Sequence, residues 1–113
     1  MGNRGQQVLR ITIHETEDTM VIQLEGRIAG PWAAELSRTW LETAPRLASR
    51  KLSLDLRNVT YTDVSGKQIL QEIFAQTGAS LVTSTPWTQY LAEEVTGQNQ
   101  NRTEGEPKDG NNE

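Results

Sequence analysis

Residues 51–74 constrain this chain most, because they change from the periodicity of a strand to that of a helix across a short polar connection. Residues 51–56 (KLSLDL) alternate apolar with polar side chains and place three leucines on one face, which predicts a strand with one buried side. A helical stripe at three- and four-residue spacing follows, formed by Ile69, Leu70, Ile73 and Phe74. Asp63 precedes this stripe and is a good N-cap for the helix.

Ser65 then falls in the first turn of that helix, close to unpaired backbone N–H groups and to the positive end of the helix dipole. A phosphate on this hydroxyl would gain donors and a favourable dipole, so the fold should tolerate it. The simpler interpretation is that Ser65 only helps to start the helix, and spacing alone favours it.

The flanking segments complete a small α/β fold. Residues 8–13 and 20–25 alternate like strands, and the polar residues 14–19 between them predict an antiparallel hairpin that closes at Gly26. A first helix is expected from Pro31 to about Thr43, where Pro45 should end or kink it. We expect a short strand at residues 79–83 and a third helix that ends at Gly97. The fold class is therefore α/β, with a mixed four-stranded sheet built from the hairpin and a parallel βαβ unit, packed with about three helices.

The length of 113 residues predicts one domain, assigned to residues 1–96. Residues 97–113 contain no apolar side chain other than proline and are expected to be a disordered polar tail. The net charge of −4 argues against nucleic-acid binding, and the absence of cysteine excludes sulfur-ligated metals. No membrane insertion, leader or cofactor is expected, no catalytic set of residues can be assembled, and the predicted class is a non-enzymatic cytoplasmic protein.

The run LSLDLRNVTYTDVSG resembles the signature of STAS domains, the anti-sigma-factor antagonists of bacteria. In that family a hydrophobic strand ending in Asp-Leu is followed by a loop and an Asp-x-Ser-Gly turn, and Asp55, Leu56, Asp63, Ser65 and Gly66 stand at those places. The segment Leu24-Glu25-Gly26 also resembles the end of the second strand of the family. The resemblance extends over roughly residues 8–96 and implies a STAS-like fold.

The resemblance implies a function as a regulatory binding module in transcription. Ser65 would be the phosphorylation site, and the partner would be a serine kinase that acts as an anti-sigma factor. The partner-binding residues implied are Asp63, Val64, Ser65, Gly66 and Lys67. The alternative is a constitutive STAS subunit of a transporter or signalling complex that is not phosphorylated.

Two departures from the family pattern matter. The polar tail cannot supply the last strand and helix that STAS domains usually have, so the strand at residues 79–83 would leave an open sheet edge that favours a partner strand or a homodimer. Lys67 replaces an apolar residue, and it would either pair with a phosphate or, more simply, be a solvated helix residue.

Overall fold

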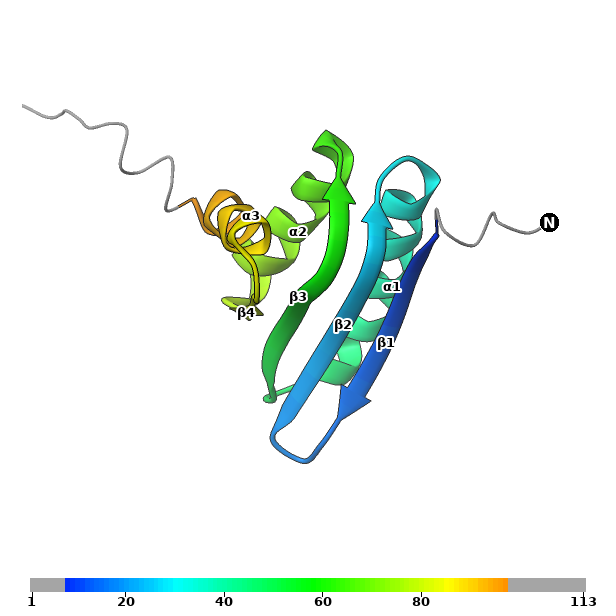
Figure 1. Ribbon diagram of the computed structural model, residues 1–113. Helices are drawn as coiled ribbons and strands as arrows, with labels where there is room; N and C mark the ends of the chain where they lie inside the picture. Colours follow the sequence, from blue (N-terminus) through cyan, green and yellow to red (C-terminus); the bar gives the residue numbers. More distant parts are fainter. Residues whose placement is uncertain (1–7, 98–113) are drawn as a thin grey trace, which may run out of the picture.

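The computed structural model describes residues 8–97, which form one sheet and three helices (Figure 1). The elements are β1 (Leu9–Glu15), β2 (Thr19–Ile28), α1 (Pro31–Leu47), β3 (Lys51–Thr62), α2 (Val64–Thr77), β4 (Ser80–Val82) and α3 (Pro86–Thr96). The expected polar tail lies outside the described residues, except for Gly97, which caps α3 with positive φ. No described helix is long and apolar enough to cross a membrane.

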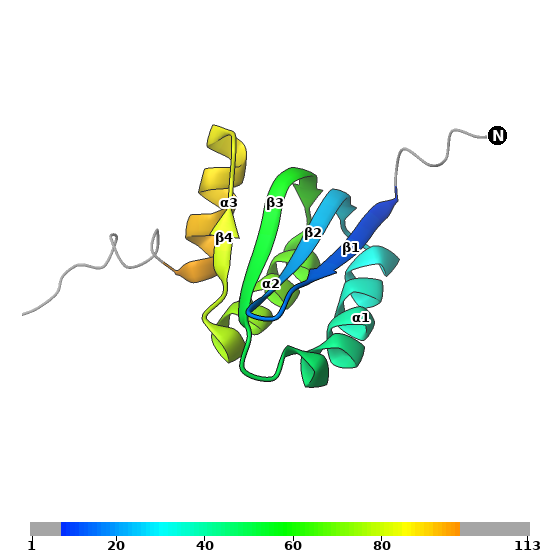
Figure 2. The same ribbon diagram turned by 90° about the horizontal axis from the view of Figure 1, so that it is seen from below.

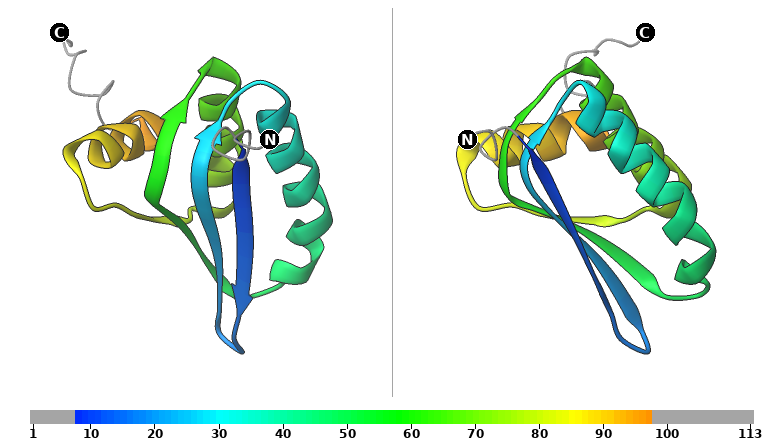
Figure 3. Two further views of the ribbon diagram at one scale, coloured as in Figure 1. Left: turned by 45° about the vertical axis from the view of Figure 1, so that its right-hand side comes forward. Right: turned by 90° about the vertical axis from the view of Figure 1, so that its right-hand side faces the viewer.

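The sheet has the strand order β1-β2-β3-β4. β1 and β2 pair antiparallel, whereas β2 with β3 and β3 with β4 pair parallel, so the predicted mixed four-stranded sheet is confirmed. Both parallel connections run in the same direction along the sheet, so a right-handed crossover puts α1 and α2 on one face (Figure 2). The third helix, α3, packs against α2 and beside β3 (Figure 3).

The hydrophobic core lies between this face of the sheet and the helices. Apolar residues of the two central strands point into it and are almost completely buried, and the three leucines of residues 51–56 confirm the buried face expected for that strand. They are Met20, Ile22, Leu24 and Ile28 of β2, and Leu52, Leu54, Leu56 and Val59 of β3. The helices contribute Leu36, Trp40, Leu70, Ile73, Leu91 and Val95.

Both central strands are longer than the sequence pattern indicates. The strand expected to end at residue 56 continues to Thr62, and β2 continues past Gly26 to Ile28. Two register shifts between the strands each add one residue to β3, so the period-two signal of β3 is lost although its pairing with β2 continues. Beyond the shifts, the guanidinium of Arg27 lies 4.4 Å from the centre of the Tyr61 ring, a cation–π contact across the two strands.

The helix α1 also passes its expected end, because Pro45 lies inside it and the helix continues to Leu47. Pro45 lies on the exposed side, where a carbonyl left without its helical donor can be hydrated. Glu15, at the end of β1, forms ion pairs with Arg46 and Arg50. These contacts hold the last turn of α1 against the hairpin.

The expected open edge is real but short. β4 has three residues and ends the sheet. Further along β3, beyond the reach of β4, two backbone carbonyls accept hydrogen bonds from side chains. The Trp87 indole Nε1 of α3 donates to the Val59 carbonyl at 3.1 Å, and the hydroxyl of Ser84, which precedes α3, donates to the Arg57 carbonyl at 3.4 Å. A homodimer through the β4 edge stays a prediction.

Candidate functional site

Asp63 joins the beginnings of two helices. It lies between β3 and α2, and its Oδ1 accepts a hydrogen bond from the Gly66 amide at 2.8 Å, which confirms it as the N-cap of α2. Its Oδ2 accepts from the Gly30 amide at 2.9 Å. Gly30 precedes α1 and has no side chain with which to cap that helix. One carboxylate therefore positions the first turns of α1 and α2 relative to each other.

The same two hydrogen bonds determine the acidity of Asp63. They favour the ionised form and hold the pKa of the carboxyl below its usual value, with the Gly30 amide having the larger effect and the Gly66 amide the next. Because this pKa is lower in the folded chain than in the unfolded one, the carboxylate stabilises the fold fully above its unfolded pKa. That stabilisation is lost as the pH falls through the folded value.

We predict that Asp63→Asn lowers the midpoint of thermal unfolding at neutral pH, because the asparagine oxygen can accept from one amide while its own NH₂ group faces the other. The difference between the two proteins should be constant above about pH 5 and should shrink below about pH 4, as the wild-type carboxylate is protonated. Circular dichroism melts across this pH range measure it. A difference that persists unchanged at about pH 2 would contradict the assignment.

Gly66 is buried in the first turn of α2, where it packs against Ile28 at the end of β2. A Cβ built on Gly66 would lie 2.0 Å from the carbonyl oxygen of Ile28 and 2.9 Å from Ile28 Cγ2. Only glycine therefore allows α2 to begin this close to the end of β2. The resemblance to STAS domains implied that Gly66 belongs to a partner surface, whereas the contact that the structure shows is within the chain.

Val64 and Ser65 are the exposed residues of this turn. The side chain of Val64 is 70% exposed, although it is a large apolar residue, and Ser65 is also exposed. The hydroxyl of Ser65 is therefore accessible to another protein, and Val64 presents apolar surface directly beside it.

Lys67 is neither a solvated helix residue nor on the side of α2 that carries Ser65. Its Nζ lies 3.1 Å from Glu94 Oε1 of α3, and the two side chains are 32% and 16% exposed. At 100° per residue, positions 65 and 67 point to opposite sides of the helix. The interpretation as a solvated lysine is therefore wrong, because the sequence does not reveal that α3 packs on this side of α2.

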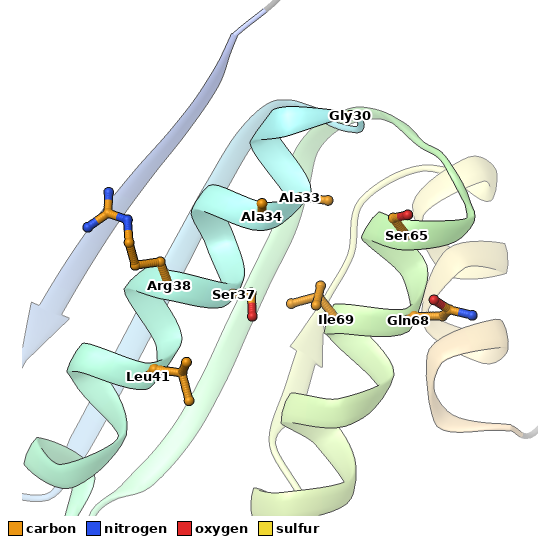
Figure 4. A pocket seen from close by; sticks show the side chains of 9 residues that line it. All are labelled: Gly30, Ala33, Ala34, Ser37, Arg38, Leu41, Ser65, Gln68 and Ile69. Carbon is orange, nitrogen blue, oxygen red and sulfur yellow. The ribbon is translucent and has the colours of Figure 1, made fainter.

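A groove of about 470 Å³ runs between α1 and α2 next to Ser65 (Figure 4). It is lined by Gly30, Ala33, Ala34, Ser37, Arg38 and Leu41 of the α1 segment, and by Ser65, Gln68 and Ile69 of α2. The contribution of α1 to this surface was not predicted from the sequence. Leu41 was the available signal, since it is a large apolar residue that lies off the apolar stripe of its helix. In the structure Leu41 is 70% exposed.

Among residues 8–97, no three histidine, aspartate or glutamate side chains are grouped so that they could hold a metal ion. What the site presents is an accessible hydroxyl at a helix beginning, beside exposed apolar surface and an open groove.

The comparison with solved structures agrees with this architecture. No protein-family model matches the sequence, and no curated protein gives a significant match. Among solved structures, an anti-sigma factor antagonist from Mycobacterium paratuberculosis is 19% identical, with a TM-score of 0.65 over 82% of this chain and 81% of that one. The anti-sigma factor antagonist SpoIIAA in its unphosphorylated form is 12% identical, with a TM-score of 0.57 over 83% of this chain and 99% of that one.

A third similar structure is an uncharacterised protein of the DUF3478 family from Shewanella loihica PV-4, described as having a SpoIIAA-like fold. It is 13% identical, with a TM-score of 0.52 over 82% of each chain. These three matches each extend over 82–83% of the chain. The chain therefore has the fold of the anti-sigma factor antagonists, the SpoIIAA-like α/β fold.

Proposed function

We propose that this protein is an anti-sigma-factor antagonist that binds a serine-kinase anti-sigma factor and is switched by phosphorylation of Ser65. The observation that carries the proposal is the exposed hydroxyl of Ser65 in the first turn of α2, on a fold shared with anti-sigma factor antagonists. The partner surface would include Val64 and Ser65. Asp63 and Gly66 would shape the turn from within the chain.

The local structure supports tolerance of a phosphate at Ser65. The hydroxyl lies at the beginning of α2, and Ser65 shares the groove with Gly30, at the beginning of α1. The positive ends of two helix dipoles are therefore near one side chain, and both favour negative charge. Phosphorylation should leave the fold intact and change mainly the surface.

The switch would act through the interface with the kinase. A phosphate adds a charge of about −1.5 to −2 at neutral pH. In a complex that covers Ser65, this charge would lose part of its hydration. The interface around it would include the exposed apolar side chain of Val64. The unmodified protein would bind the kinase and release the sigma factor, the phosphorylated protein would dissociate, and a phosphatase would restore binding.

The test is capture of partners from a lysate of the source organism by wild-type protein, Ser65→Ala and Ser65→Asp, with identification by mass spectrometry. We expect wild type and Ser65→Ala to retain a kinase-like protein and Ser65→Asp to bind it at least tenfold more weakly, since the introduced carboxylate is buried in the interface. Ser49→Asp, at an exposed serine beyond the far end of α1, is the control for added charge. Equal capture by all four proteins would refute the switch.

A constitutive STAS subunit is the second candidate, and the position of Lys67 favours it. Because Lys67 is paired with Glu94, the nearest lysine along the helix is engaged elsewhere and does not neutralise a phosphate on Ser65. This candidate predicts a stable complex with another protein that Ser65→Asp leaves unchanged.

A further inference from the structure

The groove between α1 and α2 continues the surface on which Ser65 lies. Ser65 is near the end of the groove that contains Gly30, and Leu41 lies further along α1 (Figure 4). An occupant of the groove would therefore be in reach of a protein that covers Ser65.

The walls of the groove combine small and apolar side chains with four polar ones, which are Ser37, Arg38, Ser65 and Gln68. Ala33, Ala34 and Ile69 form much of the lining. Leu41 at the rim and Val64 beside Ser65 are each 70% exposed, the largest exposed fractions among the large apolar side chains of residues 8–97. Leu41 lines the groove and Val64 is the chain neighbour of Ser65, and exposed apolar surface in and next to a groove is typical of a protein interaction site.

The charges at the groove indicate what kind of side chain it accepts. Arg38 is a lining residue, but its guanidinium is paired with Glu35 at 2.5 Å and with Glu42 at 3.2 Å on its own helix. The other lining residues are uncharged. Away from the beginnings of α1 and α2, which favour negative charge, a charged group in the groove would lose hydration without gaining an ion-pair partner that is not already engaged, so apolar side chains are the complementary occupants there.

Residues 1–7 and 98–113 do not supply such an occupant. Residues 98–113 contain no apolar side chain except proline, and residues 1–7 contain one, Met1. Neither of these two segments therefore has the apolar side chains needed to fill the groove.

We propose that the protein which binds the Ser65 surface lays the apolar face of an amphipathic helix into the groove between α1 and α2. This inference rests on the proposed function and names the contact that the partner makes. Two or more apolar side chains at helical spacing would fill a volume of about 470 Å³, as in other helix-in-groove interfaces. Because Ser65 lines the same groove, its phosphate would lie against these apolar side chains, which explains how one modification could release the whole partner.

The experiment measures the affinity of the full-length chain for the purified partner, taken as the protein that wild type captures and Ser65→Asp does not. Leu41→Glu and Ala34→Glu place a charge in the groove at exposed helix positions, so both variants should fold, and circular dichroism checks this. We expect each to weaken binding at least tenfold. Tyr90→Glu, at a 48% exposed aromatic residue of α3, is the matched control and should change binding less than twofold.

The outcomes separate the two proposals. Loss of binding with Ser65→Asp but not with the groove variants would overturn the groove and leave the switch intact. Loss with the groove variants but not with Ser65→Asp would keep the groove and favour the constitutive subunit. In that case the purified partner is the protein that wild type captures and Leu41→Glu does not.

If Ser65→Asp and Leu41→Glu capture the same proteins as wild type, a photo-crosslinking amino acid at position 41 tests whether the groove is occupied. Support then requires a crosslinked peptide from an amphipathic helix of another protein. A dimer of this chain, a small molecule or no adduct would overturn the inference.

Discussion

Replacing Gly66 with alanine should destabilise the fold by about 3 kcal/mol, a large effect for one methyl group. The new Cβ would lie 2.0 Å from the carbonyl oxygen of Ile28, and backbone cannot move aside as a flexible side chain can. The same carbonyl accepts a hydrogen bond from the Asp63 amide at 3.3 Å. A shift that relieved the clash would therefore disturb the N-cap of α2 and with it the contact to Gly30.

Urea denaturation of wild type, Gly66→Ala and Ser65→Ala measures this effect. Ser65→Ala changes the neighbouring exposed residue and should stay within about 0.5 kcal/mol of wild type. If Gly66→Ala were as stable as the control, the beginning of α2 would not be packed against the end of β2 as described.

Replacing Leu36 with alanine should cost about 2–5 kcal/mol in the free energy of unfolding, because this α1 side chain is completely buried in the core and its removal leaves a cavity. Leu41→Ala removes the same atoms from the same helix, but at a position 70% exposed. Its cost should be within about 0.5 kcal/mol.

Thermal or urea unfolding of the two variants provides this comparison, and each is the control for the other. A large loss for Leu41→Ala would show that the residue belongs to the core. The groove would then not be a surface feature. Equal and small losses would show that α1 does not pack on the sheet as described.

The fold was largely predictable because its elements carry strong local signals. The alternation of Leu52, Leu54 and Leu56 reflects one buried face of β3, and all three are buried. Asp63 and Gly97 were predictable as helix boundaries because caps depend on backbone groups a few residues away. The strand extension to Thr62 was not, since the two register shifts are a property of the strand pair and add residues to β3, which breaks its alternation.

The site was predictable only in part. The pattern around Asp63 and Ser65 located the turn, and the structure places Ser65 on the surface. Gly66 and Lys67 were assigned to a partner surface, whereas their observed contacts are with Ile28 and Glu94 of the same chain. Neither contact has a sequence signal, because both join residues far apart along the chain.

The amino-acid sequence by itself determined the order and type of the elements, since periodicity and capping depend on near neighbours. The tertiary structure alone decided which residues those elements bring together. Asp63 reaches Gly30 across 33 positions of sequence, and the groove combines one side of α1 with one side of α2. Such contacts arise from the packing of both helices on one sheet face, which no local pattern records.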